Sequence, residues 1–315
     1  MINKIIIIGL GNMGKRHLQA GARLDYIEQI FCYDREPSAL ASVPAFCLEY
    51  GINDKTLSFT SDFIDVLGAI TKDSLVIIAT TAGGRAEMLG RVIAKTPGAI
   101  IAEKPLCQSG EEYEKILTAS KARNVPVYLN FTRHAYPFYR EIKNALKGAK
   151  NRQFKAVFPN GIALIGIHMF DLMTWLFDAK KYSFLDNNLQ EQFETKRMGY
   201  FDFFGGITLK TGDDDTCVFS AVKGNDLFSI DISSSGKQFV IYESAGKLIA
   251  SEGMNKIDIT EIKTPFTSQV MDKVIDNIAR GKAEIGLPDV FESHLAHKIL
   301  FEYMRVHGLA GINIT

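Results

Sequence analysis

Long hydrophobic runs are absent from this sequence of 315 residues. The apolar run Ile5–Ile8 is far shorter than the roughly 18 apolar residues that a membrane span needs. It is also too short for the core of a signal peptide, and it leads directly into a glycine motif. We therefore expect a cytoplasmic protein that has no membrane as a partner.

Cysteine is scarce, and metal-binding patterns are lacking. The four cysteines include no CxxC pair and no metal-ligand spacing, which predicts reduced and mostly buried thiols. His294 and His297 share a helix face but have no evident third ligand. The run Asp213–Asp215 suggests a cation site, although a solvated hairpin turn explains it more simply. We predict no metal site. The cysteines are Cys32, Cys47, Cys107 and Cys217.

An excess of one charge is missing as well. Thirty-six basic residues balance thirty-six acidic ones, so the formal net charge is zero. This balance gives no electrostatic reason to expect nucleic acid or an anionic surface as the main partner.

The first 130 residues alternate short β-branched runs with amphipathic stretches, which is the pattern of a parallel sheet with crossover helices. The continuous apolar character of the runs suits strands covered on both faces. We therefore predict an α/β fold whose first domain, residues 1–130, is a Rossmann dinucleotide-binding domain. Its strands are expected at Lys4–Ile8, Gln29–Tyr33, Ser74–Ala79, Ala99–Ala102 and Val125–Asn130, and its helices at Met13–Leu24, Arg85–Ala94 and Glu111–Arg123.

After about residue 150 the pattern changes to many short strand-like runs between glycine-rich or acidic turns, which is typical of an antiparallel sheet. We predict that residues 131–315 form an α/β domain with a large open, mainly antiparallel sheet, used for substrate binding and oligomerisation. Expected strands include Val218–Val222, Leu227–Ile232 and Gln238–Tyr242, and expected helices are Phe138–Leu146, Ile165–Phe177, Ser268–Ala279 and Pro288–Val306.

A glycine motif follows the first strand and opens the first helix: Gly9, Leu10, Gly11, Asn12, Met13 and Gly14. In this strand–turn–helix context the first glycine allows a tight turn, the second lets the backbone approach a pyrophosphate, and the third permits close helix–strand packing. The N–H groups at the start of the helix favour phosphate binding. His17 follows in the same helix and is interpreted as structural, with a place near the site as the alternative.

Asp34 ends the second strand, 20 residues beyond Gly14. An acidic residue at this distance is expected to accept hydrogen bonds from the adenosine ribose hydroxyls. A carboxylate there favours NAD, because it repels the 2′-phosphate of NADP. The neighbouring Arg35 keeps NADP open as an alternative.

The segment Ala102–Leu106, which reads AEKPL, follows the fifth strand and resembles the EKP signature of the Gfo/Idh/MocA oxidoreductases. The resemblance implies that Lys104 contacts the nicotinamide and the substrate, and that Glu103 lies in the cofactor site. A lysine at the carboxyl end of a parallel strand can also orient a hydroxyl or carbonyl and stabilise charge on oxygen. The alternative is a surface lysine before a helix-initiating proline.

The segment Gly166–Phe177 is similar to the same family's GxHxxDxxxWL helix, including its form in nucleotide-sugar dehydrogenases. Within it His168, Asp171 and Trp175 share one helix face. The resemblance implies that His168 exchanges the hydroxyl proton and contacts substrate together with Asp171. A histidine suits such acid–base work near neutral pH. The alternative is a structural His168 whose partner is Asp171, one turn away.

Further elements resemble the family, and some depart from it. Thr80 and Thr81 resemble its ATPN strand end, and Asn130 with Arg133 resembles its N-x-x-R strand end. Arg85 stands where a histidine is usual. Leu164 replaces the aspartate that many members place four residues before the histidine, and Ile165 is also apolar. The resemblance implies a cofactor-binding set that adds Thr80, Thr81, Arg85, Glu103, Lys104 and Asn130 to the glycine loop, Asp34 and Arg35, and it places Arg133 at the substrate.

Together these features predict hydride transfer between NAD(P) and a secondary alcohol or ketone of a sugar, sugar derivative or nucleotide sugar, in a cleft between the two domains. The alternative is a non-catalytic dinucleotide-binding sensor on the same fold, which Leu164 and Ile165 favour. Phe228, Ile230 and Ile232 alternate as in a sheet face buried against another subunit. Because the family often associates through that sheet, we expect a homo-oligomer, a dimer or a tetramer.

Overall fold

The computed structural model describes residues 2–52, 56–212, 214–224, 227–234, 236–253 and 256–315. These residues form two compact units, each with its own core. Unit 1 comprises Met1–Cys107, Glu111–Thr132 and Pro265–Phe291, and unit 2 comprises Gln108–Gly110, Arg133–Thr264 and Glu292–Thr315. Each unit is described by itself below. The predicted α/β class, a Rossmann domain with a second, mainly antiparallel sheet, is confirmed.

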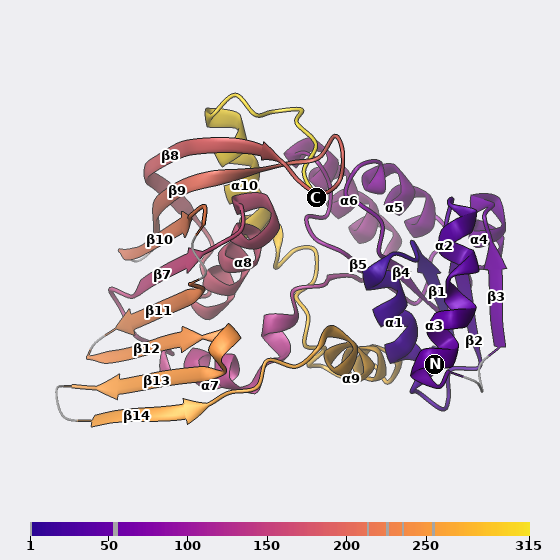
Figure 1. The fold of residues 1–315 in the computed structure, drawn as a ribbon, viewed down its shortest axis with the longest axis horizontal. Helices are drawn as coiled ribbons and strands as arrows, with labels where there is room; N and C mark the ends of the chain where they lie inside the picture. The colour runs from indigo at the N-terminus through magenta and orange to yellow at the C-terminus, as the bar shows by residue number, and fades with distance from the viewer. Residues whose placement is uncertain (1, 53–55, 213, 225–226, 235, 254–255) are drawn as a thin grey trace. The chain divides into compact units, whose positions relative to one another are not determined.

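Six parallel strands form the central sheet of unit 1, in the order β3-β2-β1-β4-β5-β6 (Figure 1). Every residue of β4 and β5 is buried, as expected for strands covered by helices on both faces. The direction of winding reverses between β1 and β4, and doubly wound sheets bind ligands at such a point. The strands are β1 (Lys4–Ile8), β2 (Gln29–Tyr33), β3 (Thr56–Thr60), β4 (Ser74–Ile78), β5 (Ala99–Ala102) and β6 (Val127–Leu129).

The helices of unit 1 include one from near the C-terminus, α9 (Thr267–Ala279), which packs on α1 (Asn12–Ala22). Tyr26 just after α1 donates a hydrogen bond of 3.2 Å to Asp276, and the apolar face of α9 is buried. The sequence placed this segment in the second domain, because a domain boundary read from pattern alone has to be contiguous. The other helices are α2 (Pro37–Ala41), α3 (Val43–Tyr50), α4 (Phe63–Ala69), α5 (Arg85–Ile93) and α6 (Gly110–Arg123).

Eight strands form the open sheet of unit 2, in the order β14-β13-β12-β11-β7-β10-β9-β8 (Figure 1). All neighbouring pairs are antiparallel except β7 with β10. Ile230 and Ile232 are buried inside unit 2 itself, so they are not the subunit contact that their alternation suggested. The strands are β7 (Gln153–Phe158), β8 (Tyr182–Glu194), β9 (Phe201–Thr211), β10 (Asp215–Ala221), β11 (Ser229–Ser234), β12 (Lys237–Tyr242), β13 (Lys247–Glu252) and β14 (Lys256–Glu261).

The principal helix of unit 2 is α8 (Ile167–Leu176), which packs on α10 (His294–Val306). A single π-helical turn, η2 (Ile162–Gly166), leads directly into α8. The predicted helix Pro288–Val306 begins later than expected, because Pro288 and Val290 extend the edge of the unit 1 sheet by hydrogen bonds to Leu129 and Val127. The remaining helices are α7 (Pro137–Ala145) and two 3-10 turns, η1 (Thr132–Ala135) and η3 (Glu243–Ala245).

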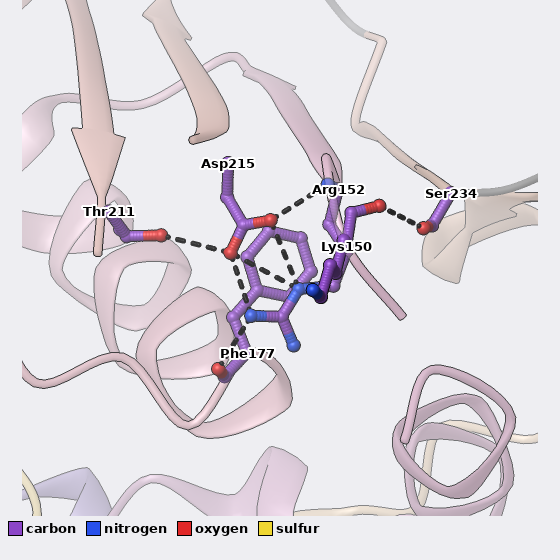
Figure 2. A network of polar contacts seen from close by, with 6 residues as sticks. All are labelled: Lys150, Arg152, Phe177, Thr211, Asp215 and Ser234. Atoms are coloured by element: carbon purple, nitrogen blue, oxygen red, sulfur yellow. Dashed lines mark hydrogen bonds and ion pairs between the residues drawn. The ribbon is translucent and has the colours of Figure 1, made fainter. Parts of the chain in front are cut away.

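A buried ion pair joins the starts of β7 and β10 (Figure 2). Asp215 accepts from the guanidinium of Arg152 at 2.7 Å and from its backbone N–H at 2.7 Å. The same guanidinium donates to the carbonyl of Phe177 and lies over its ring. The acidic run is therefore not simply a solvated turn: Asp214 takes the turn with a φ of 63°, whereas Asp215 is 1% exposed. Asp213 lies outside the described residues.

All four cysteines are buried free thiols, as the sequence predicts. Within the described part of the chain, no helix has both the length and the apolar character to cross a membrane.

Candidate active site

The glycine loop joins β1 to α1 and leaves the start of the helix open. Gly9 has a φ of 96°, which favours glycine, and a Cβ on Gly14 would lie 1.8 Å from the carbonyl oxygen of Gly9. Gly11 is the N-cap of α1 without a side-chain cap, and a Cβ placed there would meet nothing within 4 Å. Open space and uncapped N–H groups at a helix N-terminus suit a pyrophosphate. The loop therefore fits the diphosphate of a dinucleotide.

Asp34 lies beside this loop at the end of β2. Its Oδ2 accepts from the backbone N–H of Leu10 at 2.7 Å, and its Oδ1 accepts from Glu36 at 3.0 Å. A carboxylate oxygen has more than one lone pair, so both oxygens retain acceptor capacity for ribose hydroxyls. Arg35 points its charge into solvent, with a side chain 84% exposed and 3.4 Å from Glu36. The carboxylate of Asp34 therefore borders the glycine loop, whereas the guanidinium of Arg35 faces solvent.

A buried polar cluster lies at the carboxyl ends of β5 and β6. Glu103 Oε1 accepts from Asn130 Nδ2 at 2.7 Å and lies 3.1 Å from His17 Nε2. Burial alone raises the pKa of Glu103, but the hydrogen bonds to His17 and Asn130 and the charge of Lys104 outweigh it and lower the pKa below its usual value. Glu103 is therefore a buried carboxylate, and His17 donates to it. His17 is thus part of the cluster and not merely a packed residue.

Several polar atoms around this cluster are buried and have no hydrogen-bond partner among the described residues. They are His17 Nδ1, Asn130 Oδ1 and Thr80 Oγ1. Orphaned buried polar atoms are uncommon in folded proteins and usually belong to a site that a ligand or water completes. Thr80 and Asn130 lie just beyond the carboxyl ends of β4 and β6, and His17 contacts Glu103 from α1. A position at the strand ends of a doubly wound sheet fits a nicotinamide and its ribose.

Lys104 and Thr81 are half-buried at the same edge of the sheet. Lys104 precedes Pro105 through a cis peptide bond. Arg85, in contrast, is 2% exposed, and its guanidinium donates to the carbonyl oxygens of Thr80, Glu103 and Pro105. The structure thus brings Thr80, Glu103 and Lys104 together with Arg85, and it directs Arg85 to the backbone of unit 1.

His168 lies in the first turn of α8 in unit 2 and is half-buried. Leu164 and Ile165, in the preceding π-helical turn, are half-buried too. Asp202 on β9 supports this turn: its carboxylate accepts from the backbone N–H groups of Ala163 at 2.7 Å and Leu164 at 3.2 Å. π-helical turns are rare and concentrate at functional sites. The buried carboxylate of Asp202 thus holds the backbone of the turn that leads into α8.

Asp171 is 2% exposed and turned inward. Its Oδ2 lies 2.8 Å from Nε2 of His134, and its Oδ1 accepts from Ser293 at 3.4 Å. Trp175, one turn further along α8, stacks on the ring of His134. Asp171, which the structural alternative pairs with His168, thus contacts His134 and Ser293. A buried carboxylate already held by two groups is poorly placed to bind a substrate.

Arg133 is also held within its own unit. Its Nε and Nη2 donate to the two oxygens of Glu243 at 2.8 and 2.5 Å, and Tyr139 donates to the same carboxylate at 2.7 Å. Burial lowers the pKa of Arg133, but Glu243 more than offsets this and raises it, so the guanidinium keeps its charge. The guanidinium of Arg133 is thus engaged in a bidentate ion pair with Glu243, so two of its nitrogen atoms already donate within unit 2.

Sequence reasoning missed Asp202, His134 and Glu243, which hold the predicted residues in place. No local motif marks them, because each comes from a segment far from its partner in sequence. The one available signal is Gly161 before the π-helical turn: a Cβ there would lie 2.1 Å from Asp202.

Comparison with models of known protein families also identifies a dinucleotide-binding domain. Residues 3–131 match the model of the Gfo/Idh/MocA family, described as an oxidoreductase family with an NAD-binding Rossmann fold. No curated protein matches the chain by sequence.

Solved structures share the fold over nearly the whole chain. A UDP-N-acetylglucosamine 3-dehydrogenase from Acidithiobacillus ferrooxidans is 13% identical with a TM-score of 0.74, and the match covers 98% of both chains. A mutant 3-ketoreductase from Actinomadura kijaniata, in complex with TDP-benzene and NADP, is 15% identical with a TM-score of 0.72, covering 100% of this chain and 99% of that one. A super-repressor mutant of Gal80p from Saccharomyces cerevisiae is 12% identical with a TM-score of 0.74, covering 98% and 96%. At these identities the likeness establishes the fold.

Proposed function

Because this chain carries the NAD-binding Rossmann domain of the Gfo/Idh/MocA oxidoreductases, we propose that it transfers hydride between NAD(P) and a secondary alcohol or ketone of a sugar or nucleotide sugar. The dinucleotide, when bound, supplies the hydride acceptor or donor. The protein's own residues hold the dinucleotide, orient the reacting oxygen and move its proton.

The observation that carries the proposal is the ionised Glu103 beside Lys104 at the carboxyl edge of the sheet. A buried carboxylate held by Asn130 and His17 fixes the strand end from which Lys104 projects. We propose that Lys104 orients the reacting oxygen and stabilises the negative charge that develops on it. Thr80 and Asn130 offer buried, unsatisfied oxygens for the nicotinamide end of the cofactor.

His168 is the proposed acid–base group. It is half-buried at the start of a helix whose entry is held by Asp202. An imidazole there can accept the hydroxyl proton as hydride leaves the carbon. Asp171 and Arg133, which the sequence suggested for substrate contact, are proposed to position this unit through His134 and Glu243.

The names of two relatives of the fold favour a nucleotide-sugar substrate. One is a UDP-N-acetylglucosamine 3-dehydrogenase, and another is a 3-ketoreductase solved with a TDP compound. We therefore place sugars linked to UDP or TDP first among candidate substrates. A homo-oligomer, dimer or tetramer, and a cytoplasmic location remain part of the proposal.

A non-catalytic dinucleotide-dependent regulator is the alternative. The apolar, half-buried Leu164 and Ile165 at the entry to α8 favour it, and a Gal80p super-repressor shares the fold. The two functions differ in one respect that is easily measured, which is turnover.

The test is a spectrophotometric assay of NAD(P) reduction and NAD(P)H oxidation with UDP- and TDP-linked sugars and their keto forms. We expect turnover with at least one of them, and its loss in Lys104→Ala. The matched control is Lys121→Ala, which removes an exposed lysine from α6. Cofactor binding without turnover across the panel would favour the regulator.

A further inference from the structure

Arg85 is an unusual residue for its position in unit 1. It is the first residue of α5, directly after Gly84 in the left-handed conformation, and its side chain is 2% exposed. A positive charge in the first turn of a helix opposes the helix dipole, so it weakens the helix unless other groups compensate. Backbone carbonyl oxygens outside α5 supply such compensation.

The carbonyl oxygens that Arg85 binds come from two adjacent strand ends. Nη2 donates to Thr80, just beyond β4, while Nη1 donates to Glu103 at 2.6 Å and to Pro105, just beyond β5. Only arginine carries a planar, permanently charged fork that can serve several acceptors at once. The side chain therefore ties together the carboxyl ends of β4 and β5.

Lys104 lies between two of these carbonyl groups. Because the residues before and after it are both bound to one rigid guanidinium, its backbone has little freedom to rotate. Thr80, whose buried Oγ1 lacks a partner among the described residues, is held by the same guanidinium. Arg85 thus fixes two groups that the proposed function assigns to the nicotinamide end of the cofactor site.

We propose that Arg85 is a positioning residue for the nicotinamide half of the site. It acts through the backbone at Thr80, Glu103 and Pro105, and this inference rests on the proposed function of the site. The adenosine half is held separately, by the glycine loop and by Asp34. A change at Arg85 should therefore separate the binding of the two halves of the dinucleotide.

The experiment measures the affinity of the full chain for two ligands. NADH is titrated by fluorescence and ADP-ribose by calorimetry. Arg85→Lys keeps the positive charge but loses the planar fork of donors. We expect this variant to bind NADH about tenfold more weakly, which is the effect of losing one charge-assisted hydrogen bond. Its affinity for ADP-ribose should stay within about twofold of wild type. Arg91→Lys, an exposed arginine on the same helix, is the matched control and should leave both ligands unchanged.

Hydrogen exchange supplies a second, ligand-free measurement. In Arg85→Lys the amides of residues 80–84, 103, 104, 106 and 107 should exchange faster, whereas those of β1 and α1 keep their protection. Arg85→Gln, which keeps two donors without the charge, is the second variant if lysine prevents folding.

The outcomes are distinct. Equal weakening of NADH and ADP-ribose, or no weakening of either, would overturn the role of Arg85 while leaving the proposed function standing. If the wild type did not bind NADH at all, both the role of Arg85 and the proposed function would be overturned. Selective weakening of NADH with local loss of protection at Lys104 supports the inference.

Discussion

Nε2 of His134 lies 2.8 Å from Oδ2 of Asp171 in the interior of unit 2, and the two residues come from segments 37 positions apart. The contact ties the 3-10 turn η1 to the middle of α8, the helix that carries His168. It also explains why Asp171 faces inward although it shares a helix face with His168. The pair is therefore a structural support for the proposed acid–base residue.

The first prediction concerns this support. Asp171→Ala leaves a buried imidazole without its acceptor, so we expect a loss of about 2 kcal/mol in the free energy of unfolding. Urea denaturation followed by circular dichroism measures it. Asp178→Ala removes a carboxylate that is 71% exposed just after the same helix and should change stability by less than about 1 kcal/mol. Equal losses in both variants would show that the His134 contact contributes nothing of its own.

The second prediction concerns cofactor choice. Asp34 can accept from a ribose hydroxyl but repels a 2′-phosphate, so NADH should bind more tightly than NADPH by about tenfold or more. Titrating both reduced cofactors by fluorescence measures the ratio. Asp34→Asn should reduce it, whereas Arg35→Ala should not weaken NADH. A preference for NADPH would reverse this assignment and give Arg35 the leading role.

Much of the Rossmann sheet could be predicted from sequence because its signals are local. β1, β2 and β5 have the bounds that the sequence predicts, and the glycine loop joins β1 to α1 as its motif requires. β3 was missed, since TLSFT has neither a continuous apolar run nor buried residues. Helix α9 lies within one residue of its predicted bounds, but the sequence places it in the second domain, because its packing on α1 joins residues about 250 positions apart.

The site was less accessible to sequence reasoning. Motifs pointed to Glu103, Lys104 and His168, but they could not show what supports each one. Arg85 was read as a cofactor contact, and only the arrangement of three carbonyl oxygens around its guanidinium suggests otherwise. Such long-range hydrogen bonds leave no periodic trace in the sequence, because a polar side chain at an ordinary helix or strand position has no distinctive neighbours.

The third prediction concerns Lys104. Lys104→Ala should reduce turnover by about 10²-fold or more, because a positioned group that stabilises charge on the reacting oxygen is lost. Its affinity for NADH should stay within a few-fold, since the diphosphate is held at the glycine loop. Steady-state kinetics and a cofactor titration on the same preparation measure both. Turnover close to that of the wild type would remove Lys104 from the reaction.

The fourth prediction concerns alkaline pH. Burial raises the pKa of Cys32 from 9.0 to about 12, and burial with Asp276 raises that of Tyr26 from 10.0 to about 12. At a pH between the unfolded and the folded pKa of each group, the unfolded chain has lost a proton that the folded chain keeps. The free energy of unfolding therefore falls as the pH rises above about 9. Urea midpoints from pH 8 to about 11 should therefore decline steadily.

The same burial protects the thiols. A protonated, buried thiol is a poor nucleophile, so a disulfide reagent at about pH 8 should titrate almost no cysteine in the native protein. After unfolding in urea the same reagent should titrate all four. Fast reaction of a native thiol, or midpoints that rise with pH, would contradict the assignment of these groups as buried acids.

The last prediction concerns His168. Asp171 is buried inside unit 2, where it contacts His134 and Ser293, so its carboxylate is shielded from a substrate and is not expected to replace His168. His168→Asn keeps a similar shape and some hydrogen bonding but cannot take up a proton near neutral pH. We expect the wild type to show a limb near neutral pH in its pH–rate profile, and we expect His168→Asn to retain cofactor binding but to lose most turnover together with this limb.

His294→Asn, which removes a histidine from α10 in the same unit, is the matched control and should keep both turnover and the limb. The pH profile matters more than the rate, because a merely structural histidine could lower the rate without changing its dependence on pH. If His168→Asn turned over with the wild-type profile, the proton would have to leave by another route, through Lys104 or solvent, and the entry to α8 held by Asp202 would serve binding alone.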